Sequence, residues 1–210
     1  MTIIQRIQNK LKKGHFDPHK YGLLASGANV HPDSLIYSYQ NLYMHENTGI
    51  GGGSVIMNTR AKVVFKKNAD SAFGLSIITG NHLRVIGNHF ADVTDAMKDE
   101  LDPEHKLDQD VIVDEDVWIG ANVTILSGTH IGRGATIGAG SIVRGNIPPY
   151  SMVMGNPAKV VGFNFKPEEI IEHEKKLFSE NERLPIDILE RNYNKYFLKR
   201  LKDIREFCSL

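Results

Sequence analysis

Residues 113–147 read VDEDVWIGANVTILSGTHIGRGATIGAGSIVRGNI, and this stretch decides the fold. An aliphatic residue returns at every sixth position, namely at Val113, Ile119, Ile125, Ile131, Ile137 and Val143. Four residues after each of these stands a small or β-branched residue, namely Val117, Val123, Thr129, Ala135, Ser141 and Ile147. An α-helix repeats its apolar face every 3.6 residues and a lone strand every two, so a strict period of six fits neither.

The sixfold period is typical of a solenoid in which each hexad forms one short strand and one turn, and three hexads close a triangular coil. We expect both the aliphatic and the small residues to face the interior of this prism. Gly120, Gly132 and Gly138 directly follow three of the aliphatic residues, and we expect them at corners with unusual backbone dihedrals. Upstream, the period returns less regularly, with a two-residue slip after the third position, at Val30, Ile36, Leu42, Ile50 and Ile56.

Three further motifs accompany the repeat: VWIG at 117–120, IPPY at 147–150 and GNPAKVV at 155–161. Together they resemble the hexapeptide-repeat acyltransferases, and most of all the branch that contains the xenobiotic, maltose and galactoside O-acetyltransferases. The resemblance extends over roughly residues 30–165. It implies a left-handed parallel β-helix, acetyl-coenzyme A as the acyl donor, and a homotrimer whose protomers share each active site. It also implies no requirement for a metal.

The rest of the chain predicts appendages to one mainly β domain. Residues 1–27 are expected to form an N-terminal helical cap, with an amphipathic helix over residues 2–13. Residues 28–165 are expected to form the β-helix acyltransferase domain. Residues 166–210 predict C-terminal helices, because they contain two apolar stripes at helical spacing, the first preceded by Pro167 and the second by Pro185.

One region inside the expected β-helix lacks the sixfold order. Residues 61–65 and 72–79 alternate as strands do, with residues 66–70 as the turn between them. Residues 83–110 then show no period, and a loop of this length within a compact domain needs a reason. The resemblance supplies one, since such a loop leaves the prism in this branch of the family and folds over the active site.

The composition excludes several classes of protein. Lys and Arg total 25, as do Asp and Glu, so no global charge attracts nucleic acid or an anionic membrane. There is no apolar run of spanning length and no signal-peptide pattern, and we therefore expect a cytoplasmic protein with no membrane span. The single cysteine, Cys208, excludes an intrachain disulfide and argues against a thiol nucleophile.

His82 is the candidate catalytic residue. It ends the second predicted strand in the context TGNH, and the resemblance implies that a histidine in this context is the general base. An imidazole can remove a proton from an attacking hydroxyl or amine near neutral pH. Because coenzyme A carries an activated acyl group, direct transfer to a saccharide-like acceptor needs no covalent enzyme intermediate. A structural histidine at a strand end is the alternative.

The resemblance also implies the residues that contact the donor. Trp118, the only tryptophan, is expected along the pantetheine arm, and a packing role between subunits is its alternative. The other implied donor contacts are Ala121 and Ala139 at the pantetheine amides, and Arg144, Gly145 and Lys159 near the phosphates. The chain has Arg144–Gly145 where a Thr–Lys pair is familiar in this family, which leaves the contacts at the nucleotide end open.

Two rival functions remain at this point. A zinc enzyme of the γ-carbonic-anhydrase kind needs three converging histidines, and the chain offers His82 and His89 seven residues apart without an HxxxxH pair. A non-enzymatic solenoid scaffold is the second rival. The identity of the acceptor, the choice between O- and N-acylation, and the roles of His89 and His105 in an acceptor site stay open.

Overall fold

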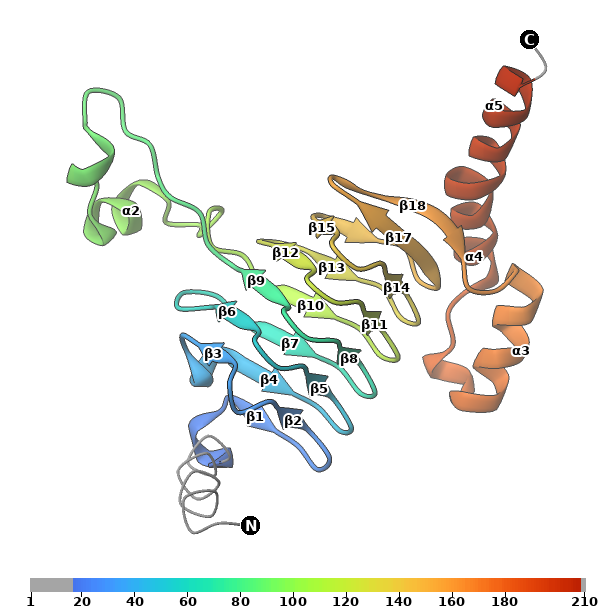
Figure 1. Ribbon diagram of the computed structural model, residues 1–210, viewed down its shortest axis with the longest axis horizontal. Coiled ribbons are helices and arrows are strands. Elements are labelled where there is room, and N and C mark those ends of the chain that lie inside the picture. Colours follow the sequence, from blue (N-terminus) through green and yellow to red (C-terminus); the bar gives the residue numbers. More distant parts are fainter. Residues whose placement is uncertain (1–16, 209–210) are drawn as a thin grey trace.

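The computed structural model describes residues 17–208, so the helix predicted over residues 2–13 lies outside the described residues. The chain forms a parallel β-helix, with one segment departing from its side and helices at its C-terminal end (Figure 1). The prediction of a mainly β protein built as a parallel β-helix is therefore confirmed.

Three sheets form the sides of the prism (Figure 1). Sheet A contains β1 (Leu23–Leu24), β4 (Leu42–Met44), β7 (Val63–Phe65), β10 (Val111–Val113), β13 (His130–Ile131) and β16 (Asn146–Ile147). Sheet B contains β2 (Asn29–Val30), β5 (Gly49–Ile50), β8 (Asp70–Ser71), β11 (Trp118–Ile119), β14 (Thr136–Ile137), β17 (Ser151–Gly155) and β18 (Ala158–Phe163). Sheet C contains β3 (Leu35–Ile36), β6 (Val55–Met57), β9 (Ser76–Ile78), β12 (Thr124–Leu126) and β15 (Ile142–Val143). The last two strands of sheet B form an antiparallel hairpin that ends the coil.

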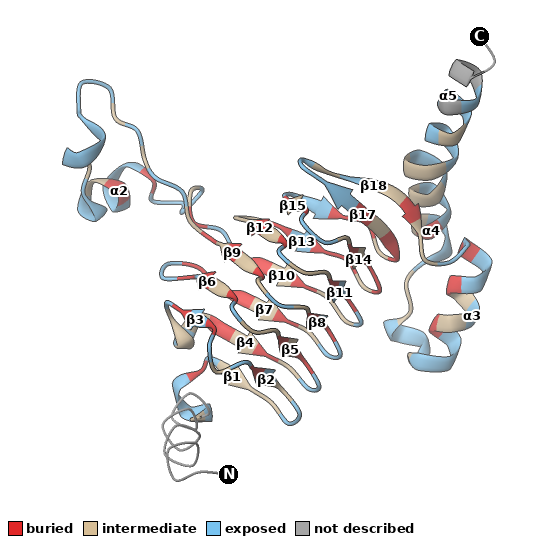
Figure 2. Cartoon of the chain, in the orientation of Figure 1, coloured by how far each residue is buried: buried red, intermediate tan, exposed pale blue. Residues whose placement is uncertain are grey.

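The interior of the prism is built from the two predicted series of residues (Figure 2). All six aliphatic residues between positions 113 and 143 are 0% exposed, and their six small or β-branched companions are at most 9% exposed. Equivalent positions pair in register from coil to coil, as Ile119 does with Ile137. The expectation that both series face inward is therefore confirmed.

The predicted position of the slip in the upstream repeat is wrong. Leu42 is buried, but Met44 is the residue that pairs with Phe65 and continues the series of interior positions. The slip therefore precedes Met44. Its cause is η3 (Tyr39–Asn41), a turn of 3-10 helix that adds two residues between β3 and β4.

The prediction of a single strand over residues 72–79 is also wrong. β7 covers the second half of the strand predicted over residues 61–65. β8, however, begins at Asp70, inside the turn predicted over residues 66–70. A second turn, which contains Gly74 at a φ of 74°, then separates β8 from β9. The sixfold period continues through this region with Ser71 at the aliphatic position, and a polar residue there conceals the repeat.

The expected role of the glycines that follow the aliphatic residues needs correction. Neither Gly120 nor Gly132 has a positive φ. A Cβ atom on Gly120 would lie 2.7 Å from the backbone nitrogen of Ala139, and one on Gly132 would lie 2.7 Å from that of Pro149. These glycines therefore permit the close approach of the next coil. The left-handed backbone conformation falls three residues after five of the six aliphatic positions, at Asp116, Asn122, Gly128, Gly134 and Gly140.

One edge of the prism receives every insertion among the described coils. Aliphatic positions stay six apart between sheets A and B and between sheets B and C. Extra residues enter only between a strand of sheet C and the next strand of sheet A, and we call this line the C–A edge. The insertions are η3, residues 58–60 between β6 and β7, and residues 79–110 between β9 and β10.

The longest insertion, residues 79–110, is the excursion, and it extends well away from the prism (Figure 1). It contains η4 (Phe90–Asp92) and α2 (Asp95–Leu101). After α2, Asp102 accepts hydrogen bonds from the backbone N–H groups of Leu107 and Lys106, at 2.8 and 2.9 Å. These hydrogen bonds hold the pKa of the Asp102 carboxyl below its usual value. The predicted excursion from the prism is therefore confirmed, and it has helical structure of its own.

Helices follow the coil, as predicted. The elements after the coil are α3 (Pro167–Leu177), η5 (Glu180–Glu182), α4 (Ile186–Tyr193), the π-helical turn η6 (Asn194–Leu198) and α5 (Lys199–Cys208). Before the coil, the described residues contain one short 3-10 helix, η2 (Pro18–Lys20). Across residues 17–208, none of the helices combines the length and the apolar composition that a membrane crossing requires.

A buried carboxylate joins α3 to the coil. Glu174 is 1% exposed and accepts hydrogen bonds from the Tyr150 hydroxyl at 2.5 Å, Arg133 Nη1 at 3.1 Å and the Leu184 backbone N–H at 3.0 Å. Burial, reinforced by the hydrogen bond to Glu174, raises the pKa of Tyr150 above its usual value, so its hydroxyl stays protonated and donates. Arg133 also lies over the Phe178 ring, 3.9 Å from its centroid.

Candidate active site

His82 lies at the base of the excursion on the C–A edge. β9 runs into the outgoing stem of the excursion, and the returning stem leads into β10. The two stems are hydrogen-bonded, with Asn81 N donating to Leu107 O at 2.8 Å and Gln109 N donating to Thr79 O at 3.0 Å. This ladder ends one residue before His82, so the side chain emerges from a well-defined backbone.

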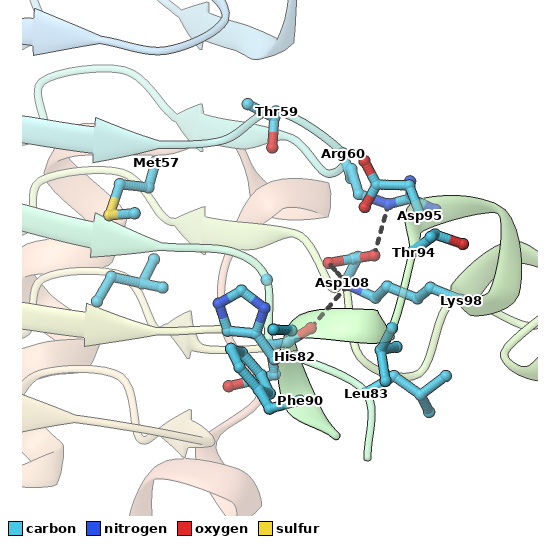
Figure 3. A pocket seen from close by; sticks show the side chains of 15 residues that line it. Met57, Thr59, Arg60, His82, Leu83, Phe90, Thr94, Asp95, Lys98 and Asp108 are labelled. Carbon is cyan, nitrogen blue, oxygen red and sulfur yellow. Dashed lines mark hydrogen bonds and ion pairs between the residues drawn. The ribbon is translucent and has the colours of Figure 1, made fainter. Parts of the chain in front are cut away.

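The His82 ring borders a cleft of about 410 Å³ between the prism and the excursion (Figure 3). It packs edge-on against the Phe90 ring, with the two centroids 4.9 Å apart. The side chain is exposed, and within residues 17–208 its ring nitrogens have no hydrogen-bond partner. A free, exposed imidazole at the mouth of a cleft is a suitable group for removing a proton from a bound acceptor.

The far side of the cleft is charged. Arg60, from the insertion between β6 and β7, lines it together with Asp95, Lys98 and Asp108 of the excursion (Figure 3). Arg60 Nε donates to Asp108 Oδ2 at 2.9 Å, and Lys98 Nζ donates to Asp108 Oδ1 at 2.7 Å. Asp95 has no ion-pair partner in the described part of the chain, so it presents an uncompensated carboxylate.

The residues expected along the pantetheine lie elsewhere on the prism. Trp118 belongs to β11 of sheet B, and its side chain is 49% exposed. Ala121 and Ala139 occupy successive turns between sheets B and C, and Ala121 O accepts a hydrogen bond from Gly140 N at 2.9 Å. A single protomer therefore does not bring Trp118 or either alanine to the cleft that contains His82.

Two of the three residues expected at the nucleotide end line a second cleft, of about 520 Å³. Arg144 and Gly145 form the turn from β15 to β16 on the C–A edge, and Arg144 lines this cleft together with Lys159 of β18. That turn lies two coils beyond β9, so about 10 Å along the prism axis at about 4.8 Å per strand. His82 and Arg144 therefore lie along the same edge of the prism, two coils apart.

Two residues of this second cleft were missed by the sequence analysis. Tyr196 of η6 and Arg200 of α5 line it, and Arg200 Nη1 donates to Val160 O at 2.7 Å. The lining thus has three cationic side chains and no carboxylate, a combination that suits a phosphorylated ligand. No signal in the sequence distinguishes Arg200 from the other basic residues of the C-terminal helices.

The other histidines considered for an acceptor site do not lie in the His82 cleft. His89 immediately precedes η4 and His105 follows α2, and neither lines the cleft. In the described ranges, no group of three His, Cys, Asp or Glu side chains is arranged to hold a metal ion.

The comparisons with known proteins agree with the fold. A family profile described as bacterial transferase hexapeptide (six repeats) matches residues 110–145. A search of curated protein sequences finds no match.

Solved structures of similar shape include three with informative ligands or names. A hexapeptide-repeat acetyltransferase from Vibrio cholerae O1 biovar eltor, solved with acetyl-coenzyme A, is 19% identical over 78% of this chain and 79% of that chain, with a TM-score of 0.55. A maltose O-acetyltransferase from Clostridium difficile 630 is 23% identical over 69% and 71%, with a TM-score of 0.54. AntD, an N-acyltransferase from Bacillus cereus solved as a mutant with dTDP-4-amino-4,6-dideoxyglucose and coenzyme A, is 15% identical over 80% and 95%, with a TM-score of 0.56.

At these sequence identities, the similarity of the structures establishes a shared fold and nothing more specific. The chain therefore contains a bacterial transferase hexapeptide repeat and has the parallel β-helix fold of the hexapeptide-repeat acetyltransferases.

Proposed function

We propose that this protein is a coenzyme A-dependent acetyltransferase that acts on a hydroxyl or amine of a saccharide-like acceptor. The observation that carries the proposal is the free, exposed ring of His82 at the mouth of the cleft between prism and excursion. The fold supports it, because proteins that share this fold have been solved with acetyl-coenzyme A or coenzyme A bound.

In the proposed reaction His82 acts as a general base. It removes the proton from the acceptor oxygen or nitrogen as that atom attacks the thioester carbonyl carbon of acetyl-coenzyme A. Collapse of the tetrahedral adduct breaks the carbon–sulfur bond, and the His82 imidazolium returns the proton to the departing thiolate. The acetyl group is then on the acceptor, and the imidazole is regenerated without a covalent enzyme intermediate.

The two clefts on the C–A edge support a path for the donor. We propose that the thioester lies beside His82 and that the phosphates lie in the second cleft, where Arg144, Lys159 and Arg200 supply positive charge. Gly145 lies in the turn next to these cations and leaves room for the ligand, since nothing lies within 4 Å of a Cβ atom placed there.

The remaining donor contacts are proposed to come from a neighbouring protomer of a homotrimer. Trp118, Ala121 and Ala139 lie away from the C–A edge of their own chain, so they can meet the pantetheine only across an interface. The outer surface of sheet C carries exposed apolar side chains, with Leu35 at 54% and Met57 at 42%. A neighbouring copy that covers these side chains removes them from water, and threefold closure suits a triangular prism.

The acceptor is proposed to bind in the His82 cleft itself. A volume of about 410 Å³ with charged residues on one wall suits a polar sugar or amino sugar. One protein of the same fold, an N-acyltransferase, was solved with an amino-sugar nucleotide. The proposal therefore includes transfer to an amine as well as to a hydroxyl. The cytoplasmic location stays a prediction.

The direct test is release of free thiol from acetyl-coenzyme A in the presence of a panel of sugars, amino sugars and their nucleotides. Acceptor-dependent thiol release, with the acetylated product identified by mass spectrometry, is the expected result. The absence of turnover across the panel, together with no binding of coenzyme A, would favour the scaffold alternative. Zinc-dependent hydration of carbon dioxide would favour the carbonic-anhydrase alternative.

The place of Trp118 in the donor site predicts a selective binding defect. Trp118→Ala is expected to raise the Kd for coenzyme A about tenfold, because the loss of one aromatic contact worth about 1.4 kcal/mol corresponds to that factor. The KM for the acceptor should change less than twofold. Calorimetric titration with coenzyme A measures the first quantity, and Leu177→Ala, which removes a 58% exposed apolar side chain of α3, is the control. A mainly acceptor-side defect would remove Trp118 from the donor site.

A further inference from the structure

A lysine inside the excursion reaches back to the backbone next to His82. Lys98 lies on α2 and is only 9% exposed. Its Nζ donates one hydrogen bond to the backbone carbonyl of Asn81 and another to Asp108 Oδ1, both at 2.7 Å (Figure 3). The lysine therefore connects the helix of the excursion to both of its stems.

The carboxylate that pairs with Lys98 is also held by a second cation. Asp108 is 6% exposed as a residue, and its Oδ2 accepts a hydrogen bond from Arg60 Nε at 2.9 Å. Arg60 belongs to the preceding coil, and its Nη2 pairs with Asp99 at the outer end of the network. Buried charges are tolerated only when they are paired in good geometry, so these directional contacts constrain where α2 can lie.

The contact with Asn81 bears directly on His82. The carbonyl of Asn81 belongs to the same planar peptide group as the backbone nitrogen of His82. Lys98 holds the oxygen of that group, and the Asn81 nitrogen is already held by its hydrogen bond to Leu107 O at 2.8 Å. With this peptide group fixed, the imidazole position depends on the φ angle of His82 and on its two side-chain torsions, and Phe90 packs against the ring.

We propose that Lys98 is a positioning residue for His82. Through the carbonyl of Asn81 and the carboxylate of Asp108, it holds the peptide that carries the imidazole and keeps the ring at the mouth of the cleft. This inference rests on the proposed function for its kinetic test only, since the geometry of the His82 ring can be measured without turnover.

The kinetic test is a double-mutant cycle. Lys98→Met keeps the length of the side chain and removes the ammonium group, and we expect kcat to fall about 10-fold to 100-fold, the cost of misplacing a reacting group by about 1 Å. The KM for acetyl-coenzyme A should stay within about threefold. In a His82→Ala background, the same substitution should cause no further loss, because its effect is transmitted through the imidazole.

The matched control is Lys106→Met, on the same excursion. The side chain of Lys106 is 72% exposed and, among residues 17–208, pairs with Glu104 alone, at 2.7 Å, so its removal should leave kcat unchanged. A purely structural role of Lys98 would lower residual turnover equally in the wild-type and His82→Ala backgrounds. That result would overturn the proposal, as would a kcat within twofold of wild type.

A second readout separates this inference from the proposed function. The imidazole resonances of His82, assigned by their absence in His82→Ala, should be shifted or broadened in Lys98→Met and unchanged in Lys106→Met. An unchanged His82 signal would overturn the positioning role even if the protein transfers no acetyl group. If Lys98→Met does not fold, as judged by thermal unfolding, Lys98→Gln keeps a neutral N–H donor and should show the same shift to a smaller extent.

Discussion

Replacement of His82 by Ala is expected to lower turnover at least about 100-fold, the low end of the contribution of a general base. The imidazole is exposed at the cleft and packs against Phe90, so its loss removes the proton acceptor without opening the interior of the prism. Steady-state thiol release measures the loss, and the coenzyme A Kd should stay within about threefold. Thermal unfolding checks that the coil is intact.

A histidine of the same excursion provides the control for this experiment. His89 is exposed, lies outside the cleft, and makes no capping hydrogen bond to η4 with its side chain. His89→Ala should therefore keep turnover within about twofold of wild type. Near-normal turnover of His82→Ala would refute the role of His82 as the base, and an equal loss in both variants would point to a defect of the whole excursion.

Removal of the buried carboxylate that joins α3 to the coil is expected to cost about 3 kcal/mol of unfolding free energy, the low end of the range for breaking a buried ion pair. Glu174→Ala leaves the Tyr150 hydroxyl and the Leu184 N–H without their acceptor, and it removes one carboxylate partner of Arg133. Unsatisfied buried donors add to the loss. Denaturant unfolding of the variant and the wild-type protein measures the difference.

Glu172, on the same helix, distinguishes this effect from the loss of any carboxylate. Its side chain is 70% exposed and pairs with Lys176 at 2.7 Å, one helical turn away. Glu172→Ala should therefore change the unfolding free energy by less than about 0.5 kcal/mol. A Glu174→Ala variant as stable as Glu172→Ala would show that the contacts of Glu174 with the coil contribute little to stability.

The regular coils could be predicted because their requirement is local. Ile119, Ile125 and Ile131 each fill the same cross-section of the prism, so the same side-chain class recurs at a fixed spacing. Where a polar residue takes that position, as Ser71 does, the repeat is concealed, and the strand prediction fails there. The glycine positions were recognised, but the close approach of Ala139 to Gly120 becomes visible only when successive coils are stacked.

The candidate site was only partly predictable. His82 was found through the TGNH context and the family resemblance, and the structure places it at a cleft. Lys98 looked like one charged residue among many in a segment without a period. Its partners follow from the path of the excursion, because Asn81 and Asp108 lie on opposite stems and meet only when the stems pair.

By itself the sequence determined the parallel β-helix, the interior residues of its regular coils and the segment that leaves it, since a repeat that packs on copies of itself shows its period in the chain wherever the interior residue is apolar. Only the tertiary structure decided that every insertion enters at the C–A edge and that Arg60, Lys98 and Asp108 form one charged network beside His82. It also decided that Arg200 joins Arg144 and Lys159 in one cleft. Such contacts join residues far apart in the chain, and no local spacing encodes them.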